Sequence, residues 1–568
     1  TRTEPGTLEL LDSRRLTGPN VLTDAPAAII DVAAGGDEIE PRIEAWREQV
    51  RRILDAVGWT GARIFERRVA GGVSLGFEAP EDALYVATDV NDWAYDAATR
   101  VLGGERPPSV EEAGRALADT IDRESNSRLV TLAAAARERG LPVLMDDDAL
   151  SIGYGCRSRT WPVGDLPAPD QVDWGALDDI PVGLVTGTNG KTTTVRLAAA
   201  MVRQAGLHVG LSSTDQIAVD DDVLDHGDYS GPGGARAVLR DQRVDVAVLE
   251  TARGGLLRRG AGMTRADAAV ITNIAADHLD DYGVTDLEAL ADIKWLVTRP
   301  LGDDGVAILN AEDPRLVERA TGFSGEIAWF ALDPAAPPRA AERAGAACFW
   351  YVEDGWLVRE EHGDKFRIAE EARIPVALGG AARHNVANSL AAAGLAHALG
   401  VPDGAIGEAL TVTASSANPG RCNLFLVGGV TVLVDFAHNP HGVTALRPVV
   451  EHYGTGQRLL VLGQAGDRGD ETIRELALAA WGFRPDRIVL KEMGHYARGR
   501  APGEVAGILR DAFVSAGATP AHITHVDEEL DAVRAAIDLA SPGDLVIALV
   551  HEDVDAIVRL LSELAAAS

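Results

Sequence analysis

The segment that most constrains the fold of this chain is VGLVTGTNGKTTTVRLAAAMV, residues 182–202. An apolar run leads into a short loop with Gly187 and Gly190, and an amphipathic helical pattern begins at Lys191. This order places backbone N–H groups at a helix N-terminus, where phosphate oxygens bind. The long G-x-x-x-x-G-K-[ST] pattern needs a glycine at position 185, which is valine. The sequence therefore predicts a short phosphate-binding loop at one edge of a parallel α/β sheet.

This loop supplies the first candidate site residues. The Lys191 ammonium group would meet the terminal phosphate of a nucleotide, and the Thr192 hydroxyl would face Mg²⁺. The alternative is a strand, turn and helix in which the glycines occur by chance. We expect nucleotide contacts from Gly187, Thr188, Asn189, Gly190, Lys191, Thr192 and Thr193.

Composition excludes several classes of partner. The formal net charge of −33 disfavours nucleic acid and anionic membranes, which attract basic surfaces. The three cysteines, Cys156, Cys348 and Cys422, lie far apart and form no CxxC pair, which favours a reducing cytosol and argues against a zinc site or disulfide framework. No apolar run has membrane-spanning length, and the N-terminus lacks a signal-peptide pattern. We expect a cytoplasmic homo-oligomer without nucleic-acid or membrane partners.

The 568 residues imply several domains. Helical periodicity covers 43–57, 109–123 and 127–139, and residues 83–87 resemble a short strand. The Pro- and Asp-rich segment 157–180 is typical of a linker, and beyond it strands at 182–186, 244–249, 268–272 and 306–309 alternate with helices. A second alternating block begins near 430. We predict a multidomain α/β fold with an N-terminal α+β domain (1–165), a central parallel-sheet domain carrying the phosphate loop (178–416) and a C-terminal Rossmann-like domain (417–568).

Side chains that could bind metal follow the central strands. Glu250 ends an apolar strand, where α/β sheets bind ligands, and His278 follows the end of another strand. Thr285 and Glu288 have capping-box spacing, so a helix should begin there, with Lys294 on its apolar face. The chain has only four lysines, and an inward lysine is unusual unless paired or modified. We therefore hypothesise a carbamylated Lys294 that binds a second Mg²⁺; the alternatives are a surface Glu, a solvent-facing His and a surface Lys.

A further set of polar residues suits a nucleotide site. Asn can bind an adenine edge, Asp can accept from a ribose hydroxyl, and Arg can bind a phosphate. Each of these residues taken alone is ordinary turn or cap chemistry, and only their order and spacing carry the signal. The candidates are Asn310, Asp313, His384, Asn385, Asn388, Arg421 and Asp435.

Together these motifs resemble a known family. GTNGKTT, the strand-end Glu250, TNIAADHLD, the Lys294 helix, LNAEDP, RHNVANSLAAA and NPGR with VDFAHNP resemble the Mur ligase superfamily over residues 180–568. The strongest likeness within it is to cyanophycin synthetases, through LETARGGLLRRG and GDRGDETI, and through LTGPN and the segment ending in GYG in the N-terminal part. In that family an ATP-grasp module follows GYG, whereas here only residues 157–180 separate Tyr154 from the Mur-type part.

The resemblance implies an ATP-dependent, ADP-forming ligase that joins a carboxylate and an amine through an acyl phosphate. It implies catalytic roles for Lys191, His278 and Lys294, one Mg²⁺ on Thr192 and Glu250, and another on His278 and carbamylated Lys294. The product would be an amide or isopeptide between an amino acid and the carboxylate of an amino acid, peptide or polymer. Alternatives are a kinase, a folylpolyglutamate-synthase-like ligase, or a non-catalytic nucleotide-binding partner of a separate ATP-grasp enzyme. Candidate substrate contacts are Thr214, Asp215, Ser230, Arg253, His438, Asn439, Asp467, Arg468 and Arg498.

Overall fold

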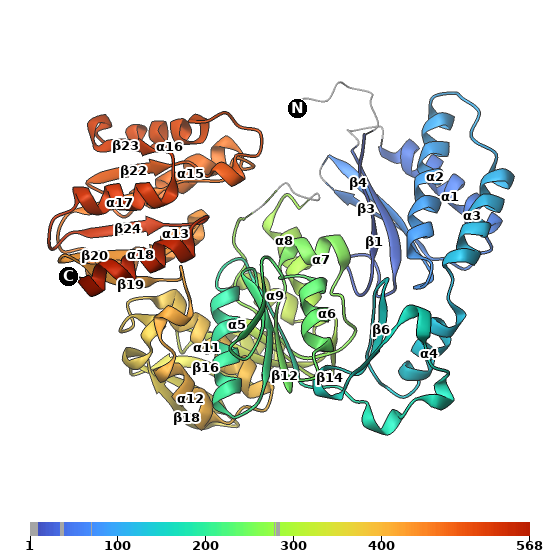
Figure 1. Cartoon of the computed structure of the whole chain (residues 1–568), viewed down its shortest axis with the longest axis horizontal. Coiled ribbons are helices and arrows are strands. Elements are labelled where there is room, and N and C mark those ends of the chain that lie inside the picture. The colour runs from blue at the N-terminus through green and yellow to red at the C-terminus, as the bar shows by residue number, and fades with distance from the viewer. Residues whose placement is uncertain (1–8, 34–38, 70, 278, 280–283, 568) are drawn as a thin grey trace.

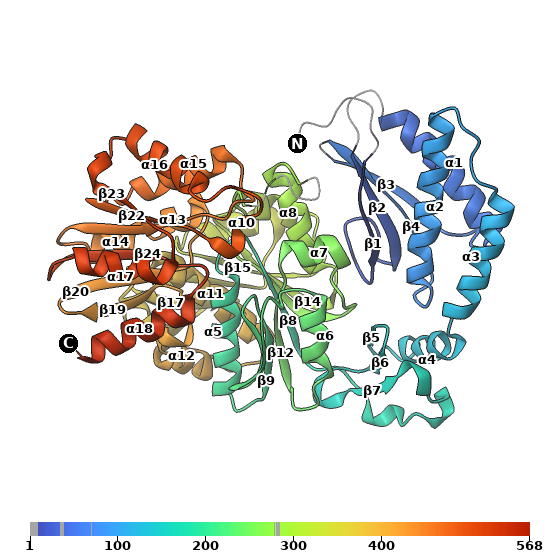
Figure 2. The ribbon, with the colours of Figure 1, turned by 45° about the horizontal axis from the view of Figure 1, so that its top comes forward.

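The computed structural model describes residues 9–33, 39–69, 71–277, 279 and 284–567. The predicted fold class is confirmed: a small N-terminal sheet region, a central α/β region and a C-terminal α/β region follow one another along the chain. The central region lies between the other two (Figure 1), and the same order is visible in the turned view (Figure 2). Within the described residues, no helix is both long and apolar enough to cross a membrane. The domain boundaries inferred from the sequence stay predictions.

The N-terminal region packs helices on one antiparallel sheet with strand order β1-β2-β4-β3. Its strands are β1 (Glu9–Leu16), β2 (Ala27–Ala33), β3 (Ile64–Val69) and β4 (Gly72–Glu78), and its helices are α1 (Ile39–Ala56), α2 (Leu84–Leu102) and α3 (Val110–Glu124). A smaller unit follows, with α4 (Ser127–Arg137), β5 (Val143–Met145), β6 (Ala149–Ile152) and β7 (Arg159–Pro162). The segment 157–180 packs against α4 of this unit. Its side chains Trp161, Leu166 and Val172 are buried in that contact.

One prediction for this region is wrong. Residues 83–87 were expected to form a strand, but they begin helix α2. Val86, Val90, Ala94 and Ala97 are all buried, at the spacing of one helix face. The helical pattern of buried residues extends over several turns, and it outweighs the β-propensity of five residues.

The central region is built on a sheet with strand order β11-β10-β9-β12-β8-β13-β14-β15-β16-β17-β18, parallel from β9 to β16. The strands are β8 (Val182–Thr186), β9 (Val209–Ser212), β10 (Gln216–Val219), β11 (Asp222–His226), β12 (Val246–Glu250), β13 (Ala266–Ile271), β14 (Leu301–Asn310), β15 (Glu326–Ala331), β16 (Cys348–Glu353), β17 (Trp356–Glu361) and β18 (Asp364–Glu370). Helices α5 (Lys191–Gln204), α11 (Arg383–Ala398) and α12 (Asp403–Val412) cover one face. Helices α6 (Pro232–Arg240), α7 (Arg253–Arg259), α8 (Leu287–Trp295), α9 (Pro314–Ala320) and α10 (Ala336–Ala344) cover the other.

Both edges of this sheet are antiparallel and charged. At one edge β10 and β11 form a hairpin, and β11 is exposed along its whole length, with Asp222 and Asp225 on it. At the other edge β18 pairs with β17 and exposes Asp364, Lys365 and Arg367. The parallel strands that carry the phosphate loop and Glu250 therefore lie in the protected middle of the sheet.

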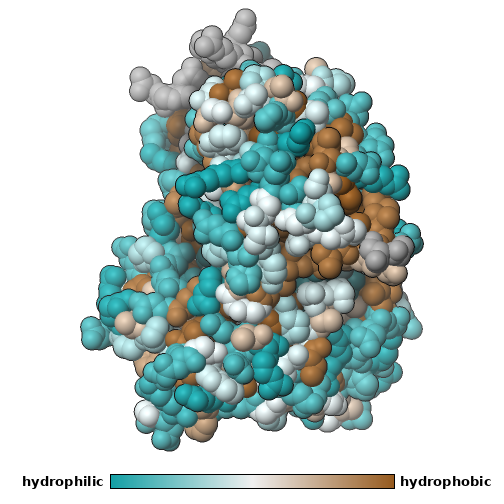
Figure 3. Space-filling model, turned by 90° about the vertical axis from the view of Figure 1, so that its left-hand side faces the viewer, coloured by the Kyte–Doolittle hydropathy of each residue, from teal (hydrophilic) through white to brown (hydrophobic). Residues whose placement is uncertain are grey.

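The C-terminal region has a second sheet with order β19-β20-β24-β21-β22-β23, parallel except for the β19–β20 pair. Its strands are β19 (Asn423–Val427), β20 (Val430–Asp435), β21 (Arg458–Leu462), β22 (Arg487–Lys491), β23 (Ile523–Val526) and β24 (Leu545–Leu549). Its helices are α13 (Pro440–Ala445), α14 (Arg447–Tyr453), α15 (Asp470–Trp481), α16 (Glu504–Ser515), α17 (Glu529–Leu539) and α18 (Val554–Ala567). On the side of the molecule shown in Figure 3, the surface is mainly hydrophilic with smaller hydrophobic areas between.

The segment LTGPN docks the N-terminal region on the central one. The backbone N–H of Thr17 donates to Arg259 O at 3.0 Å, and Ala261 N–H donates to Pro19 O at 2.8 Å. Arg299 adds a hydrogen bond to Asn20 O at 2.7 Å. The end of helix α7 is therefore held by backbone pairing with the N-terminal region.

Candidate functional site

The phosphate loop joins β8 to α5 at the carboxyl edge of the central sheet. Gly187 and Gly190 have φ values of 148° and 87°, in the region that favours glycine. A Cβ at Gly190 would collide with the Asn388 side chain, so the loop packs directly against α11. Gly190 offers no side-chain cap to α5, whose first N–H groups can therefore bind an anion. The Lys191 ammonium folds back onto Thr188 O at 3.1 Å.

Thr192 and Glu250 lie together beside this loop. The Thr192 hydroxyl donates to Glu250 Oε2 at 2.9 Å and lies 3.1 Å from the Thr214 hydroxyl. Glu250 is only 2% exposed, and its other oxygen, Oε1, is buried and has no hydrogen-bond partner among the described residues. Burial raises the pKa of the Glu250 carboxyl, while Lys191 and Thr192 oppose that effect. A buried carboxylate oxygen without a partner beside a hydroxyl is a donor set that fits Mg²⁺.

Lys294 faces inward, as the helical pattern predicted. It is 4% exposed, and its ammonium donates to Gly187 O at 2.7 Å, so it contacts the phosphate loop directly. Burial lowers the pKa of Lys294 well below its usual value, and the charge of Lys191 lowers it further. The helix cap differs from the prediction: Asp286, not Thr285, accepts from Ala289 N–H at 2.8 Å. His278, which is predicted to bind the second Mg²⁺ together with Lys294, lies outside the described residues.

Several predicted nucleotide contacts have hydrogen bonds that organise the site loops. Asn310 donates to Thr272 O at 3.0 Å, and Asp313 caps α9 while accepting from Ile274 N–H at 2.7 Å. Asn385 donates to Val376 O at 2.9 Å. Asn388 is buried, donates to Asn385 and touches the phosphate loop. Asn388 is thus placed beside the loop, while Asn310, Asp313 and Asn385 fix the loops next to it.

The C-terminal region contacts the phosphate loop. Asn189 and Asn439 exchange side-chain hydrogen bonds at 3.2 and 3.0 Å, and Asn189 also lies 2.9 Å from His441 Nδ1. Asp277 lies 3.5 Å from His438 Nε2 and 3.2 Å from Arg468 Nη2. These contacts bring three predicted substrate residues, His438, Asn439 and Arg468, to the central site.

The remaining predicted substrate residues are more dispersed. Asp215 pairs with Arg196 at 2.8 Å, and Ser230 is buried and hydrogen-bonded to Asp228. Arg253 begins helix α7 and lies near enough to Lys294 to lower its pKa. Asp467 and Arg498 lie 3.7 Å apart in the C-terminal region.

Two residues at the site were missed. Arg196 lies one helical turn after Thr192, and its Nη1 is buried and has no hydrogen-bond partner in the part of the chain that the structure describes. That i, i+4 spacing on a helix that starts at the phosphate loop was the available signal. His441 lies directly after Asn439-Pro440, and nothing in the sequence separates it from an ordinary helix-start residue.

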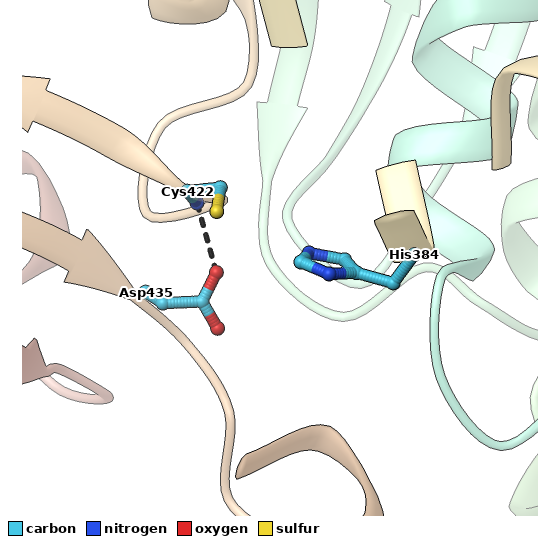
Figure 4. A group of neighbouring side chains, drawn as sticks. All are labelled: His384, Cys422 and Asp435. Carbon is cyan, nitrogen blue, oxygen red and sulfur yellow. Dashed lines mark hydrogen bonds between the residues drawn. The ribbon is translucent and has the colours of Figure 1, made fainter. Parts of the chain in front are cut away.

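His384, Cys422 and Asp435 form a compact cluster where the central and C-terminal regions meet (Figure 4). Asp435 accepts from Cys422 N–H and Ala437 N–H, both at 2.8 Å. The neighbouring Arg421 guanidinium stacks on Phe436 at 4.2 Å. Two predicted nucleotide residues, His384 and Asp435, are therefore adjacent in space although His384 lies on helix α11 of the central region and Asp435 ends strand β20 of the C-terminal sheet.

A cavity of about 1030 Å³ lies between β1 and α7, away from the phosphate loop. Arg14, Arg15, Arg258 and Arg259 line it, and Gly255 of α7 borders it. Arg14 forms ion pairs with Asp12 and Asp31, so these two carboxylates neutralise part of the positive charge that lines the cavity.

Comparisons with known proteins agree with this architecture. Residues 185–396 match the Mur ligase middle domain, and residues 420–549 match the Mur ligase glutamate ligase domain. The cyanophycin synthetase of Crocosphaera subtropica is 38% identical over 72% of this chain and 46% of its own length. That of Synechocystis is 36% identical over 77% of this chain and 49% of its own. The chain thus spans about half the length of the curated relatives it matches.

Among solved structures, a bifunctional folylpolyglutamate synthase/dihydrofolate synthase with Mn, AMPPNP and L-glutamate bound aligns with a TM-score of 0.49 at 20% identity. The alignment covers 67% of this chain and 89% of that structure. Because two Mur ligase domains match residues 185–396 and 420–549, and cyanophycin synthetases are similar in sequence, the chain belongs to the Mur ligase family.

Proposed function

We propose that the chain is an ATP-dependent, ADP-forming ligase that joins an amino acid to the carboxylate of an amino acid, peptide or polymer. The observation that carries this proposal is the pairing of Thr192 with buried Glu250 directly beside Lys191. Glu250 Oε1 has no hydrogen-bond partner in the described part of the chain, so it is free to bind a metal ion next to a phosphate.

We assign separate roles in phosphate binding and metal binding to residues around the phosphate loop. The N–H groups at the start of α5 and the Lys191 ammonium bind the phosphate oxygens of ATP and neutralise charge that grows during transfer. Thr192 and Glu250 would hold Mg²⁺, which supplies Lewis-acid stabilisation of the phosphoryl oxygens. Lys294, with its lowered pKa, can react with CO₂ as a neutral amine and gain a carboxylate for a second ion.

The proposed reaction has two steps, phosphoryl transfer and amide formation. The γ-phosphoryl group passes to a substrate carboxylate oxygen, and ADP leaves. An amine then attacks the acyl carbon, its proton is lost to a base, and inorganic phosphate leaves as the amide forms. Asn439 and His438 come from the C-terminal region, so its closure on the loop would assemble the site and exclude water.

The arginine-lined cavity supports an acidic acceptor longer than one amino acid. Helix α7 begins at Arg253, near Lys294, and Arg258 and Arg259 lie at its other end, about 8 to 9 Å away by helix geometry. An extended peptide covers that distance with about three residues. Carboxylates on such a peptide would bind the arginines while its terminal or side-chain carboxylate reaches the phosphate loop.

An ADP-release screen of amino acids against acidic peptides, including aspartate-rich ones, tests the proposal. We expect ADP release that needs both a carboxylate and an amine, and its loss in Lys191→Ala. ADP release with one substrate and a stable phosphorylated product would instead identify a kinase. Nucleotide binding without ADP release in any pairing would support the non-catalytic alternative.

A further inference from the structure

The cluster of His384, Cys422 and Asp435 has the donor atoms of a zinc site. One imidazole nitrogen, the Cys422 sulfur and one Asp435 oxygen lie within 4.8 Å of one another. Figure 4 shows the three side chains directed toward a common space. Among the described residues, this is the one group of three or more such side chains that meets this distance. Cys422 and Asp435 are buried, and His384 is partly exposed.

The surroundings of the cluster hold these donors in place. His384 Nδ1 lies 3.2 Å from Ala445 O, so a proton on Nδ1 donates to that carbonyl and leaves the lone pair of Nε2 for a metal. This is the arrangement of most metal-binding histidines. The Asp435 carboxylate is oriented by the two backbone N–H groups that it accepts from.

The donor set selects the ion. A thiolate and an imidazole bind zinc well, whereas Mg²⁺ prefers oxygen ligands throughout. Zn–S and Zn–N bonds of about 2.3 and 2.0 Å require the donors to move together by about 1 Å. Three protein ligands would leave a fourth position for water, and the thiol proton would pass to solvent on binding.

We propose that His384, Cys422 and Asp435 bind one Zn²⁺ and that this ion inhibits the protein. His384 belongs to helix α11 of the central region, whereas Cys422 and Asp435 belong to the C-terminal sheet region. A bound ion would link the two regions and engage Asp435, one of the two aspartates that we predict could accept a hydrogen bond from a ribose hydroxyl of ATP. The inhibition therefore rests on the proposed ATP-dependent function, whereas metal binding does not.

The sequence argued against a zinc site because no two cysteines are close together along the chain. The fold instead brings one cysteine to a histidine and an aspartate from separate elements. Cys348 lies elsewhere, in strand β16, and serves as the control, whereas the exposed Cys156 is removed from the test protein.

The binding test uses the full chain, freed of metal with a chelator and carrying Cys156→Ala. Co²⁺ is titrated as a spectroscopic probe, and Zn²⁺ is then added in competition. We expect one ion per chain, a thiolate-to-cobalt absorption band, and displacement by Zn²⁺. Cys422→Ser should remove the band and weaken Zn²⁺ binding at least tenfold, whereas Cys348→Ala should change neither. A band that persists in Cys422→Ser would overturn the site; Cys422→Ala gives a second test if the serine variant does not fold.

The inhibition test measures ADP release at constant Mg²⁺ with buffered Zn²⁺. Wild type should be inhibited and should recover as ATP is raised, while Cys422→Ser should keep its zinc-free rate throughout. Zn²⁺ that binds through Cys422 without inhibition, or with inhibition that ATP does not relieve, would overturn the regulatory part alone. Absence of ADP release under all conditions would count against the proposed function, and the cobalt titration would still decide the metal site.

Discussion

At the scale of single residues, Glu250 is the most informative. Its Oε2 accepts a hydrogen bond from Thr192, and its Oε1 has no partner within the residues that the structure describes, although the side chain is buried. Burying an unpaired carboxylate oxygen is costly, so the position makes physical sense when a cation is bound.

We expect Glu250→Gln to lower ADP release by about 100-fold, because it removes the negative charge that would hold the metal. Mn²⁺ affinity, measured by electron paramagnetic resonance, should fall with it. Glu326→Gln removes an exposed carboxylate at the start of β15 and should leave both quantities unchanged. Full activity in Glu250→Gln would contradict the metal assignment.

Lys294 gives the second prediction at this scale. A lowered ammonium pKa leaves more neutral amine near neutral pH, and only the neutral amine reacts with CO₂. The carbamylated fraction should therefore rise as pH rises through the pKa of Lys294, and ¹³C-bicarbonate should give a carbamate signal in the NMR spectrum. Lys294→Ala should lose that signal and most of the turnover, whereas Lys365→Ala, on exposed strand β18, should lose neither. Full turnover in Lys294→Ala would exclude a carbamate role.

At the scale of elements, helix α8 holds Lys294 against the phosphate loop, and its N-cap is Asp286. Asp286→Ala should lower the free energy of unfolding by about 1 kcal/mol, because the Ala289 N–H loses its acceptor. Thr285→Ala is the matched control and should change stability by less than about 0.5 kcal/mol. Chemical denaturation of both variants measures the difference, and a larger effect in Thr285→Ala would show that the capping-box prediction was right.

The order of elements was predictable because apolar strands and amphipathic helices alternate over long stretches. The strands around the phosphate loop and the inward face of α8 followed from that periodicity. The helical structure of residues 83–87 did not follow from it, because an apolar run of five residues is compatible with a strand or a helix. The burial of Val86 and Val90 on one face identifies the helix. The cap of α8 was misplaced by one residue, since Thr285 and Asp286 are both good N-caps.

The proximity of Glu250 to the phosphate loop was predictable because both follow strands of one sheet. Glu250 and the phosphate loop end the neighbouring strands β12 and β8, so their proximity follows from topology. The contact of Asn189 with Asn439 joins two sheets, and no sequence period encodes it. The same holds for Cys422, whose position beside His384 depends on how the two regions pack.

At the scale of the whole molecule, the neutral amide groups of Asn189 and Asn439 form two of the hydrogen bonds between the phosphate loop and the C-terminal region. Asn439→Ser keeps a cap for helix α13 but cannot reach both atoms of Asn189. Two lost hydrogen bonds should lower ADP release by about tenfold. Small-angle scattering with an ATP analogue should show a less compact average shape. Unchanged scattering and activity would indicate that other contacts hold the regions together.

The charged edges of the central sheet also affect how copies of the chain meet one another. An open sheet edge offers unpaired N–H and C=O groups to any strand that approaches, and charged side chains discourage that pairing. Asp222 and Asp225 at one edge and Asp364 at the other do so through ionised carboxylates. Acidification toward the isoelectric point near 4.7 removes much of the repulsion between copies. We therefore expect acid-induced aggregation of this chain to begin with strand addition at β11 and β18, before the buried parallel strands separate.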